Sequence, residues 1–255
     1  TSIASDYTGQ ITLTGLTPET QYYYMFNNST DVNVYQFKTF PTPGTNKDFK
    51  FVVFSDLKAT STQPAPAYAM AALDVPDFAL QIGDFDHDDP GASPQPTTVD
   101  NWRLNTKGVI RDNVAGLELA THILSKTPFE HVWDDHDYGC NNCFKTMQYK
   151  DLARQAFLEY FPTYPYPNAD AGIWRSFRYG QAEFIILDMH SQRDNHYDLD
   201  DANKSMIDGD NIINGQKEWL KNTLLNSTAK WKFIISTWTF NPNVPGGQVE
   251  VYYYN

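Results

Sequence analysis

Positive charge is scarce in this sequence. Only 19 Lys and Arg residues stand against 31 Asp and Glu residues, which gives a formal net charge of −12. Nucleic-acid binding needs a basic surface that matches the phosphate backbone, and an anionic membrane surface attracts clusters of basic residues. The sequence also lacks an apolar run of about 20 residues, the length that spans a bilayer. The composition therefore argues against nucleic-acid binding, membrane-surface binding and a membrane span.

Cysteine is equally scarce, because Cys140 and Cys143 are the only two. A structural zinc site needs about four ligands, and no second Cys pair supplies them. A redox motif of the thioredoxin type would instead lie at the start of a helix after a strand. A local disulfide between Cys140 and Cys143 is the favoured prediction.

Three glycosylation sequons indicate an extracellular protein. They are Asn28 (with Asn27 as the alternative acceptor), Asn203 and Asn226, each in a polar, loop-like stretch. Such triplets are acceptors for N-linked glycans if the protein is secreted. No signal peptide is visible, which is expected if Thr1 follows a processed or missing segment. Together with the predicted disulfide, this favours a secreted protein that carries N-linked glycans.

The chain divides by pattern into three parts. Residues 1–40 alternate apolar and polar residues from Gln10 to Phe26 and again from Val34 to Phe40, which predicts about three antiparallel strands. A Pro/Gly-rich linker spans 41–47, and residues 48–255 alternate strands with helices, which is typical of an α/β domain. Helices are expected at Pro66–Leu73, Val99–Ser125, Met147–Tyr160 and Gly215–Leu225. Strand-forming apolar runs that end on polar residues span 51–56, 78–87 and 131–137, and further strands are expected at Ala182–Leu187 and Trp231–Thr237.

Polar side chains follow three of the apolar strands where each strand ends. Asp56 follows the first, Asp84 and His87 the second, and Asp134 to Asp137 the third. The ligand site of an open α/β sheet lies beyond the carboxyl ends of its strands. Carboxylates gathered there would repel one another unless cations neutralised them. The sequence therefore predicts a metal centre at this edge of the sheet.

Spacing suggests a role for each of these residues. Gly83 lets the backbone turn sharply, so that Asp84 can bridge two cations while His87 turns back to one of them. Asp56 would bind one metal and Asp135 the other, and His136 is placed as a proton donor or phosphate contact. Two such metals activate water near neutral pH and hold the attacking and leaving oxygens.

Other polar residues are expected to be structural. This group contains a strand-end cap, two packing or surface histidines and two arginines that flank a strand: Asp188, His122, His131, Arg175 and Arg178.

Four stretches resemble the PhoD-like (alkaline phosphatase D type) branch of the metallophosphoesterases. IGDFDH (residues 82–87) is similar to its second motif, and VWDDHDYGCNN (132–142) is similar to its W-D-D-H-[DE] motif. FRYGQAEFIILDMHSQRD (177–194) and GQKEWLKNTLLNSTAKWKFIIS (215–236) resemble two later elements. The segment LTGLTPETQYYYMF before them resembles the last strands of a fibronectin type III-like sandwich. The resemblance implies an α/β, layered sheet-and-helix metallophosphoesterase domain after a small all-β, sandwich-like segment.

The resemblance also implies functional residues. Asp84 and Asp135 match metal ligands, Arg193 matches a phosphate-binding arginine and Asn142 an asparagine that contacts phosphate or metal. His190 stands where the family has its first arginine, whereas Asp56 and His87 stand where the family often has cysteine and tyrosine. Those family ligands suit iron with calcium, whereas carboxylate plus imidazole suits zinc, manganese, iron or magnesium equally well. The family completes its site with later ligands, so residues 48–255 are expected to form a domain that is incomplete at its carboxyl end.

The preferred function is metal-dependent hydrolysis of phosphate mono- or diesters by a secreted enzyme, with two metal ions as cofactors. His136 would protonate the leaving group, and Arg193 would hold the phosphate. The alternative is a non-catalytic secreted protein that retains this fold for assembly or adhesion, and self-assembly is left open.

Overall fold

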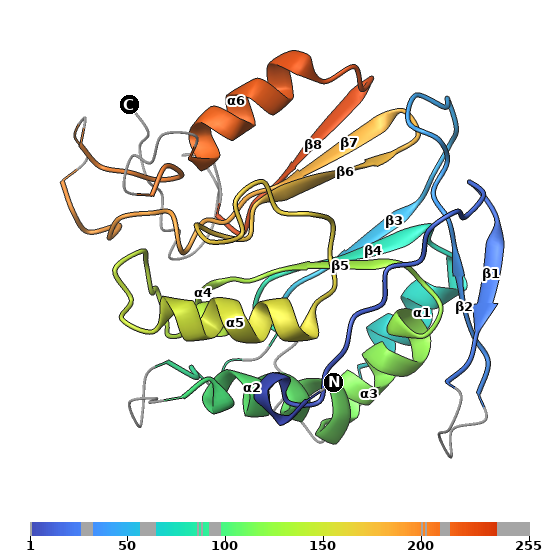
Figure 1. Cartoon of the computed structure of the whole chain (residues 1–255), viewed down its shortest axis with the longest axis horizontal. Helices are drawn as coiled ribbons and strands as arrows, with labels where there is room; N and C mark the ends of the chain where they lie inside the picture. Colours follow the sequence, from blue (N-terminus) through green and yellow to red (C-terminus); the bar gives the residue numbers. More distant parts are fainter. Residues whose placement is uncertain are drawn as a thin grey trace.

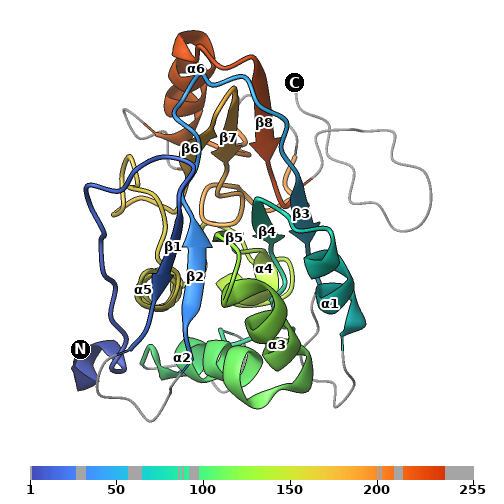
Figure 2. The same cartoon turned by 90° about the vertical axis from the view of Figure 1, so that its right-hand side faces the viewer.

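The fold is an α/β sandwich in four layers (Figures 1 and 2). The computed structural model describes residues 2–26, 33–56, 65–85, 87, 89–91, 98–199, 201, 203–209 and 215–238. Two three-stranded sheets lie face to face, with α6 on the outer face of one and α1, α2, α3 and α5 on the outer face of the other. The α/β architecture predicted from the sequence is confirmed.

The first sheet is parallel and has the order β3-β4-β5. Its strands are β3 (Phe51–Phe54), β4 (Phe78–Ile82) and β5 (Phe129–Val132). The second sheet has the order β6-β7-β8, with an antiparallel β6-β7 pair and a parallel β7-β8 pair. Its strands are β6 (Arg175–Tyr179), β7 (Ala182–Ile186) and β8 (Trp231–Ile235).

Three helices lie where the sequence places them. They are α1 (Pro66–Leu73), α5 (Lys150–Tyr160) and α6 (Gln216–Asn226). The single long helix expected at 99–125 is wrong. The structure has α2 (Asp100–Lys107) and α3 (Val114–Leu119), each continued by a wider π-helical segment, η2 (Gly108–Asp112) and η3 (Ala120–Leu124). Asn113 causes the break because its backbone is extended and its side chain accepts a hydrogen bond from Ala115 N at 3.0 Å, which caps α3.

Aromatic side chains fill the space between the sheets. Phe78 lies 4.9 Å from Phe184, centroid to centroid, and Phe184 lies 4.8 Å from Phe233. Side chains alternate between the faces of a strand, so Ala79 packs toward the helices while Ile185 packs toward α6. Both sheets are therefore packed on two faces, and the central strands β4 and β7 are buried along almost their whole length.

A buried ion pair joins the two sheets. Arg175 on β6 is fully buried and donates to Glu130 on β5 through Nε at 3.0 Å and Nη2 at 2.6 Å. Its Nη1 donates to Ile173 O at 2.9 Å. The structural role expected for Arg175 matches this geometry. His131, the next residue on β5, is 2% exposed and packs against Phe161.

The amino-terminal residues are less regular than expected. β1 (Gln21–Tyr24) and β2 (Tyr35–Lys38) form an antiparallel pair, and Thr17 N donates to the Tyr22 hydroxyl at 2.8 Å, the kind of contact that a tyrosine corner makes. The strand expected around residues 10–16 does not form, because an alternating pattern specifies extended chain but not a pairing partner. The fibronectin type III-like assignment stays a prediction.

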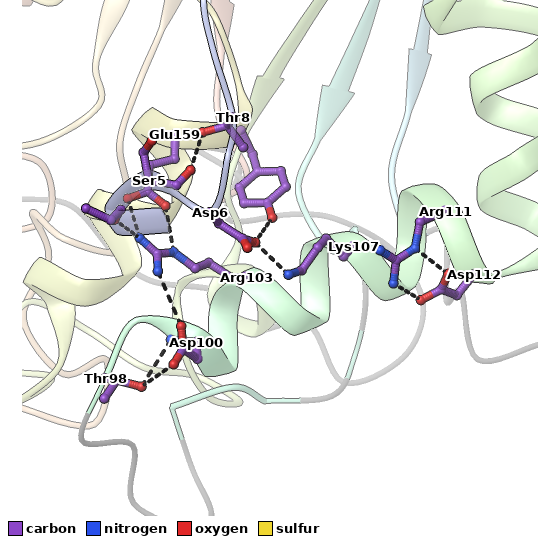
Figure 3. A network of polar contacts seen from close by, with 12 residues as sticks. Ser5, Asp6, Thr8, Thr98, Asp100, Arg103, Lys107, Arg111, Asp112 and Glu159 are labelled. Carbon is purple, nitrogen blue, oxygen red and sulfur yellow. Dashed lines mark hydrogen bonds and ion pairs between the residues drawn. The ribbon is translucent and has the colours of Figure 1, made fainter. Parts of the chain in front are cut away.

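Instead, the first residues dock onto two helices of the α/β part (Figure 3). A short 3₁₀ helix, η1 (Ile3–Ser5), presents Ala4 O to Arg103 on α2. Arg103 also holds Glu159 on α5 with bonds of 2.7 and 2.8 Å, and Lys107 lies 2.6 Å from the Asp6 carboxylate. The segment is thus anchored to the outer helical layer by charge-assisted contacts.

A prediction for stability follows from the ion pair between the sheets. Glu130→Gln should lower the free energy of unfolding by about 3 kcal/mol, because it leaves the buried Arg175 guanidinium without its counter-charge. Urea unfolding followed by circular dichroism measures the change. Asp112→Asn is the control because the Arg111–Asp112 pair is exposed, and it should change the value by less than about 0.5 kcal/mol. Equal effects of the two substitutions would contradict the prediction.

Candidate metal centre

The polar residues that follow three parallel strands lie at one edge of the first sheet. The register pairs Phe54 with Gln81 and Ile82 with Val132, so the carboxyl ends of β3, β4 and β5 lie side by side. In each case the first candidate ligand stands two residues beyond the strand, at Asp56, Asp84 and Asp134. The convergence that the strand pattern predicts is therefore present.

Gly83 makes the close approach between two of these ends possible. Its φ is +86°, and a Cβ built on it would lie 2.3 Å from the Cβ of Asp134. Asp137 also connects the two turns. Its carboxylate accepts hydrogen bonds from Phe85 N at 2.7 Å and Asp134 N at 3.1 Å. The turn after β4 is thus held directly against the turn after β5.

The first cluster of candidate ligands contains Asp84, His87 and His136. One ligand atom from each lies within 4.8 Å of the others. His87 Nε2 is 3.4 Å from Asp84 Oδ2 and 3.6 Å from Asp56 Oδ1. Both aspartates adopt left-handed backbone with φ of 50°, a conformation that costs energy outside glycine and is typical of functional sites. Asp56, Asp84 and His87, predicted to lie within reach of one or two cations, therefore lie close together.

The second cluster contains Asp134, Asp135 and His190, again with ligand atoms within 4.8 Å of one another. The sequence predicts Asp135 as a ligand, but it gives no metal role to Asp134 or His190. Asp135 Oδ1 accepts a hydrogen bond from His136 N at 3.0 Å, and Oδ2 accepts one from Asn142 N. Such bonds orient a ligating carboxylate. Nothing in the sequence near His190 signals this cluster, because it depends on packing between the two sheets.

His136 is held by a carboxylate that sequence reasoning missed. Its Nδ1 lies 2.7 Å from Asp89 Oδ1, and its ring stacks on His87 at 4.3 Å. Burial lowers the pKa of His136, but the neighbouring carboxylates of Asp135, Asp84 and Asp89 outweigh that effect and raise it. His136 is therefore oriented by Asp89, and its raised pKa favours the protonated imidazole. Asp89 lies in a Pro/Gly-rich stretch without periodicity, so only the fold identifies it.

Arg193 lies beside the cluster but faces the backbone. Its side chain is fully buried, its Nη2 donates to Asn142 O at 3.2 Å and Cys143 O at 3.1 Å, and its guanidinium stacks 4.0 Å from the ring centre of Trp238. In this geometry Arg193 positions the loop that carries Asn142. Direct phosphate contact by Arg193 or Asn142 stays a prediction.

The same loop is closed by a disulfide between Cys140 and Cys143, with a Cα–Cα distance of 5.2 Å. The predicted disulfide is confirmed, so neither cysteine offers a thiolate to a metal. Of the sequons, Asn203 and Asn226 are exposed, and Asn28 lies outside the described residues. Glycosylation stays a prediction.

Asp84 has the most unusual environment in the centre. It is 8% exposed, and its Oδ1 is buried without a hydrogen-bond partner among the described residues. Burial, followed by the charges of Asp134, Asp135 and Asp56, raises the pKa of Asp84 to about 7. A cation at Oδ1 would satisfy that oxygen and offset the repulsion, so carboxylate and imidazole donors here fit a metal ion.

This environment predicts a pH dependence in metal-free protein. Folded Asp84 keeps its proton up to pH about 7, whereas the unfolded chain releases it near pH ~4. Its contribution to stability should therefore fall as the pH rises between these values. The measurement is the difference in unfolding free energy between wild type and Asp84→Asn across that range. A difference that stays flat or grows in favour of wild type would contradict the prediction, and added metal should abolish the fall.

A second prediction concerns Gly83. Gly83→Ala should lower metal affinity and stability together, because the new methyl group collides with Asp134 and separates the two ligand-bearing turns. Gly15→Ala is the control, since its φ is +72° but nothing lies within 4 Å of its added Cβ. It should cost only the backbone strain of about 1–2 kcal/mol. Metal titration by calorimetry separates the two variants, and unchanged metal affinity in Gly83→Ala would refute the role of the close approach.

In the described part of the chain, no helix is long and apolar enough to cross a membrane.

Comparison with known proteins places the chain in a family. It is 26% identical over 250 residues to alkaline phosphatase D of Bacillus subtilis (strain 168), a match that covers 86% of this chain and 42% of that protein. A solved structure of PhoD matches with a TM-score of 0.64 and 25% identity, covering 86% of this chain and 48% of that one. The purple acid phosphatase PPD1 from yellow lupin seeds matches with a TM-score of 0.53 and 18% identity, covering 86% of this chain and 36% of that one, which shows a shared fold. This chain thus spans less than half the length of each relative. The model of the PhoD-like phosphatase family matches residues 62–255, and the chain belongs to that family.

Proposed function

We propose that the protein containing this chain hydrolyses phosphate mono- or diesters at a centre of two metal ions. The observation that carries the proposal is the buried Asp84 carboxylate, with one oxygen unpaired, set among Asp56, Asp135, His87 and His136. Membership of the PhoD-like phosphatase family supports the same reaction class. Metal ions in such a centre activate water and stabilise the charge that develops on phosphate.

The candidate ligands of this chain can be assigned to two metal positions. Asp56, Asp84 and His87 would hold one ion, while Asp84 and Asp135 would hold the other. The donors are carboxylates and imidazoles without thiolate, which suits zinc, manganese, iron or magnesium.

His136 would donate the proton to the leaving oxygen. Its Nδ1 is engaged by Asp89, so Nε2 is the atom left to face a substrate, and neighbouring carboxylates favour the protonated form.

Secretion is part of the proposal. The disulfide between Cys140 and Cys143 supports an oxidising compartment, and the exposed sequons at Asn203 and Asn226 are accessible to N-linked glycans. The net charge of −12 makes bound cations the source of attraction for an anionic substrate.

Two substitutions in the full-length polypeptide test the reaction. Asp84→Asn should abolish hydrolysis of an aryl phosphate ester and reduce bound metal to at most one ion, because it removes the shared ligand. His136→Ala should keep both metals but lower kcat by roughly 10²–10⁴, the usual size of acid–base catalysis. Rates are read from phenolate release, and metal from elemental analysis.

His122→Ala is the matched control, since His122 pairs with Glu118 at 3.2 Å on the helical surface away from the centre. It should leave both rate and metal content unchanged. A full-length protein that carries no metal and cleaves neither mono- nor diesters would favour the non-catalytic alternative instead.

A further inference from the structure

The disulfide between Cys140 and Cys143 closes a short loop beside the candidate metal centre. Within this disulfide loop (residues 140–143), Asn142 N donates a hydrogen bond to Asp135 Oδ2. Hydrogen bonds of this kind orient a ligating carboxylate, and the loss of such a partner typically lowers metal affinity by about 10–100-fold. The disulfide loop therefore contributes directly to the position of a predicted metal ligand.

Asn142 makes this contact from an unfavourable backbone conformation. Its φ is +59°, in the left-handed region that residues other than glycine seldom adopt. Because such a conformation costs energy, the surrounding structure must keep it in place. Arg193 helps, since its Nη2 donates to Asn142 O at 3.2 Å and to Cys143 O at 3.1 Å, and the disulfide adds a covalent restraint. Relaxation of Asn142 in an opened loop would turn its N–H away from Asp135.

A second contact links the same segment to the predicted proton donor. Gly139 directly precedes the disulfide loop, and its carbonyl oxygen accepts a hydrogen bond from Gly91 N at 2.7 Å. The two backbones lie so close together that a Cβ on Gly91 would be 3.0 Å from Gly139 Cα. Gly91 follows Asp89 by two residues, and the Asp89 carboxylate holds His136. A shift of the loop would therefore also disturb the support of His136.

The short span of this disulfide makes its effect local. Cys140 and Cys143 are three residues apart, and a loop this short removes little conformational freedom from the unfolded chain. Stabilisation of the whole fold is therefore a minor part of its effect. Cys140 is half-buried whereas Cys143 is 7% exposed, so a thiol reagent reaches the bond from the side of Cys140.

We infer that the disulfide loop positions the metal centre, so that metal affinity depends on the redox state of Cys140 and Cys143. The two cysteines and Asn142 are positioning residues, because they act through Asp135 and through the support of His136. This inference rests on the proposed function, which takes Asp135 as a metal ligand. The centre then binds metal weakly in a reducing compartment and forms fully once the pair is oxidised, as in a secreted protein.

The redox step is thiol–disulfide exchange with a dithiol. A thiolate of the dithiol attacks Sγ of Cys140, forms a mixed disulfide and releases Cys143 as a thiolate. The second thiol of the dithiol then displaces Cys140 and closes a cyclic disulfide. The dithiol loses two electrons and two protons, and the protein pair gains them and ends as two thiols.

Metal binding and oxidation of the pair are coupled reciprocally. If reduction raises the Kd for metal by some factor, bound metal must favour the oxidised pair by the same factor. For this two-electron couple, a tenfold change in the equilibrium constant corresponds to about 30 mV. A disulfide that only braced the fold would show no such link between its potential and bound metal.

The experiment is a titration of metal-stripped, full-length protein with manganese, before and after reduction by dithiothreitol at one pH, with the reagent removed under nitrogen. Manganese is used because carboxylates suit it, whereas thiolates prefer softer metals. Calorimetry should show, for at least one bound ion, a Kd about 10–100-fold higher in the reduced protein. The midpoint potential of the pair should be about 30–60 mV more negative in saturating manganese than without metal.

The double variant Cys140→Ser with Cys143→Ser is the matched control. It should bind manganese with the raised Kd of the reduced protein, because it lacks the same restraint. Treatment with dithiothreitol should change its Kd no further, which attributes the redox effect to this pair. Circular dichroism of the reduced wild type should match that of the oxidised protein, which shows that the fold persists.

Other results would contradict the inference. If the oxidised and reduced proteins bind manganese with Kd values within twofold of each other, the loop does not position the ligands, while the proposed function stands. If reduction abolishes the circular dichroism signal, the disulfide supports the whole fold and not the centre in particular. If the oxidised protein binds neither manganese nor zinc, the proposed function fails together with the inference.

Discussion

One buried carboxylate, Asp188, ties the second sheet to the strand end that carries the candidate metal ligands. Asp188 follows β7 and is fully buried, yet it accepts hydrogen bonds from Trp133 Nε1 at 2.8 Å, Ile173 N at 3.0 Å and Ser191 N at 3.1 Å. A charge that has lost its hydration needs several donors, and these come from three separate segments. Since Trp133 directly precedes Asp134 and Asp135, this contact fixes where the ligand-bearing turn lies relative to the second sheet.

The carboxylates of the candidate metal centre repel one another when no metal is bound, and the same arrangement favours a bound cation. Burial and like charge both disfavour an ionised Asp84, and left-handed backbone at Asp56 and Asp84 adds strain. Packing around Gly83 and the hydrogen bonds to Asp137 keep these groups together despite that cost. The arrangement that suits metal binding therefore lowers the stability of the metal-free fold at this site. A bound cation would offset that cost.

Much of this could be predicted from the sequence because it depends on local pattern. The strands before Asp56, Asp84 and Asp135 follow from apolar runs, and parallel pairing brings their ends together. The positions of His190 and Asp89 could not be predicted, because they depend on how two sheets and a loop pack. The break at Asn113 was missed because the apolar periodicity continues across it, although an asparagine that caps a new helix is a recognisable signal.

The first residues of the chain contact helices on the far side of the predicted linker at residues 41–47. Arg103 is 7% exposed and donates one of its hydrogen bonds to Ala4 O, and Gln10 Nε2 donates to Leu158 O at 2.6 Å. A protease cut at the linker 41–47 would therefore leave two pieces that still hold each other, in the manner of a fragment complementation pair. The boundary at residues 41–47 stays a prediction from the sequence pattern, and contacts between the two parts cross it.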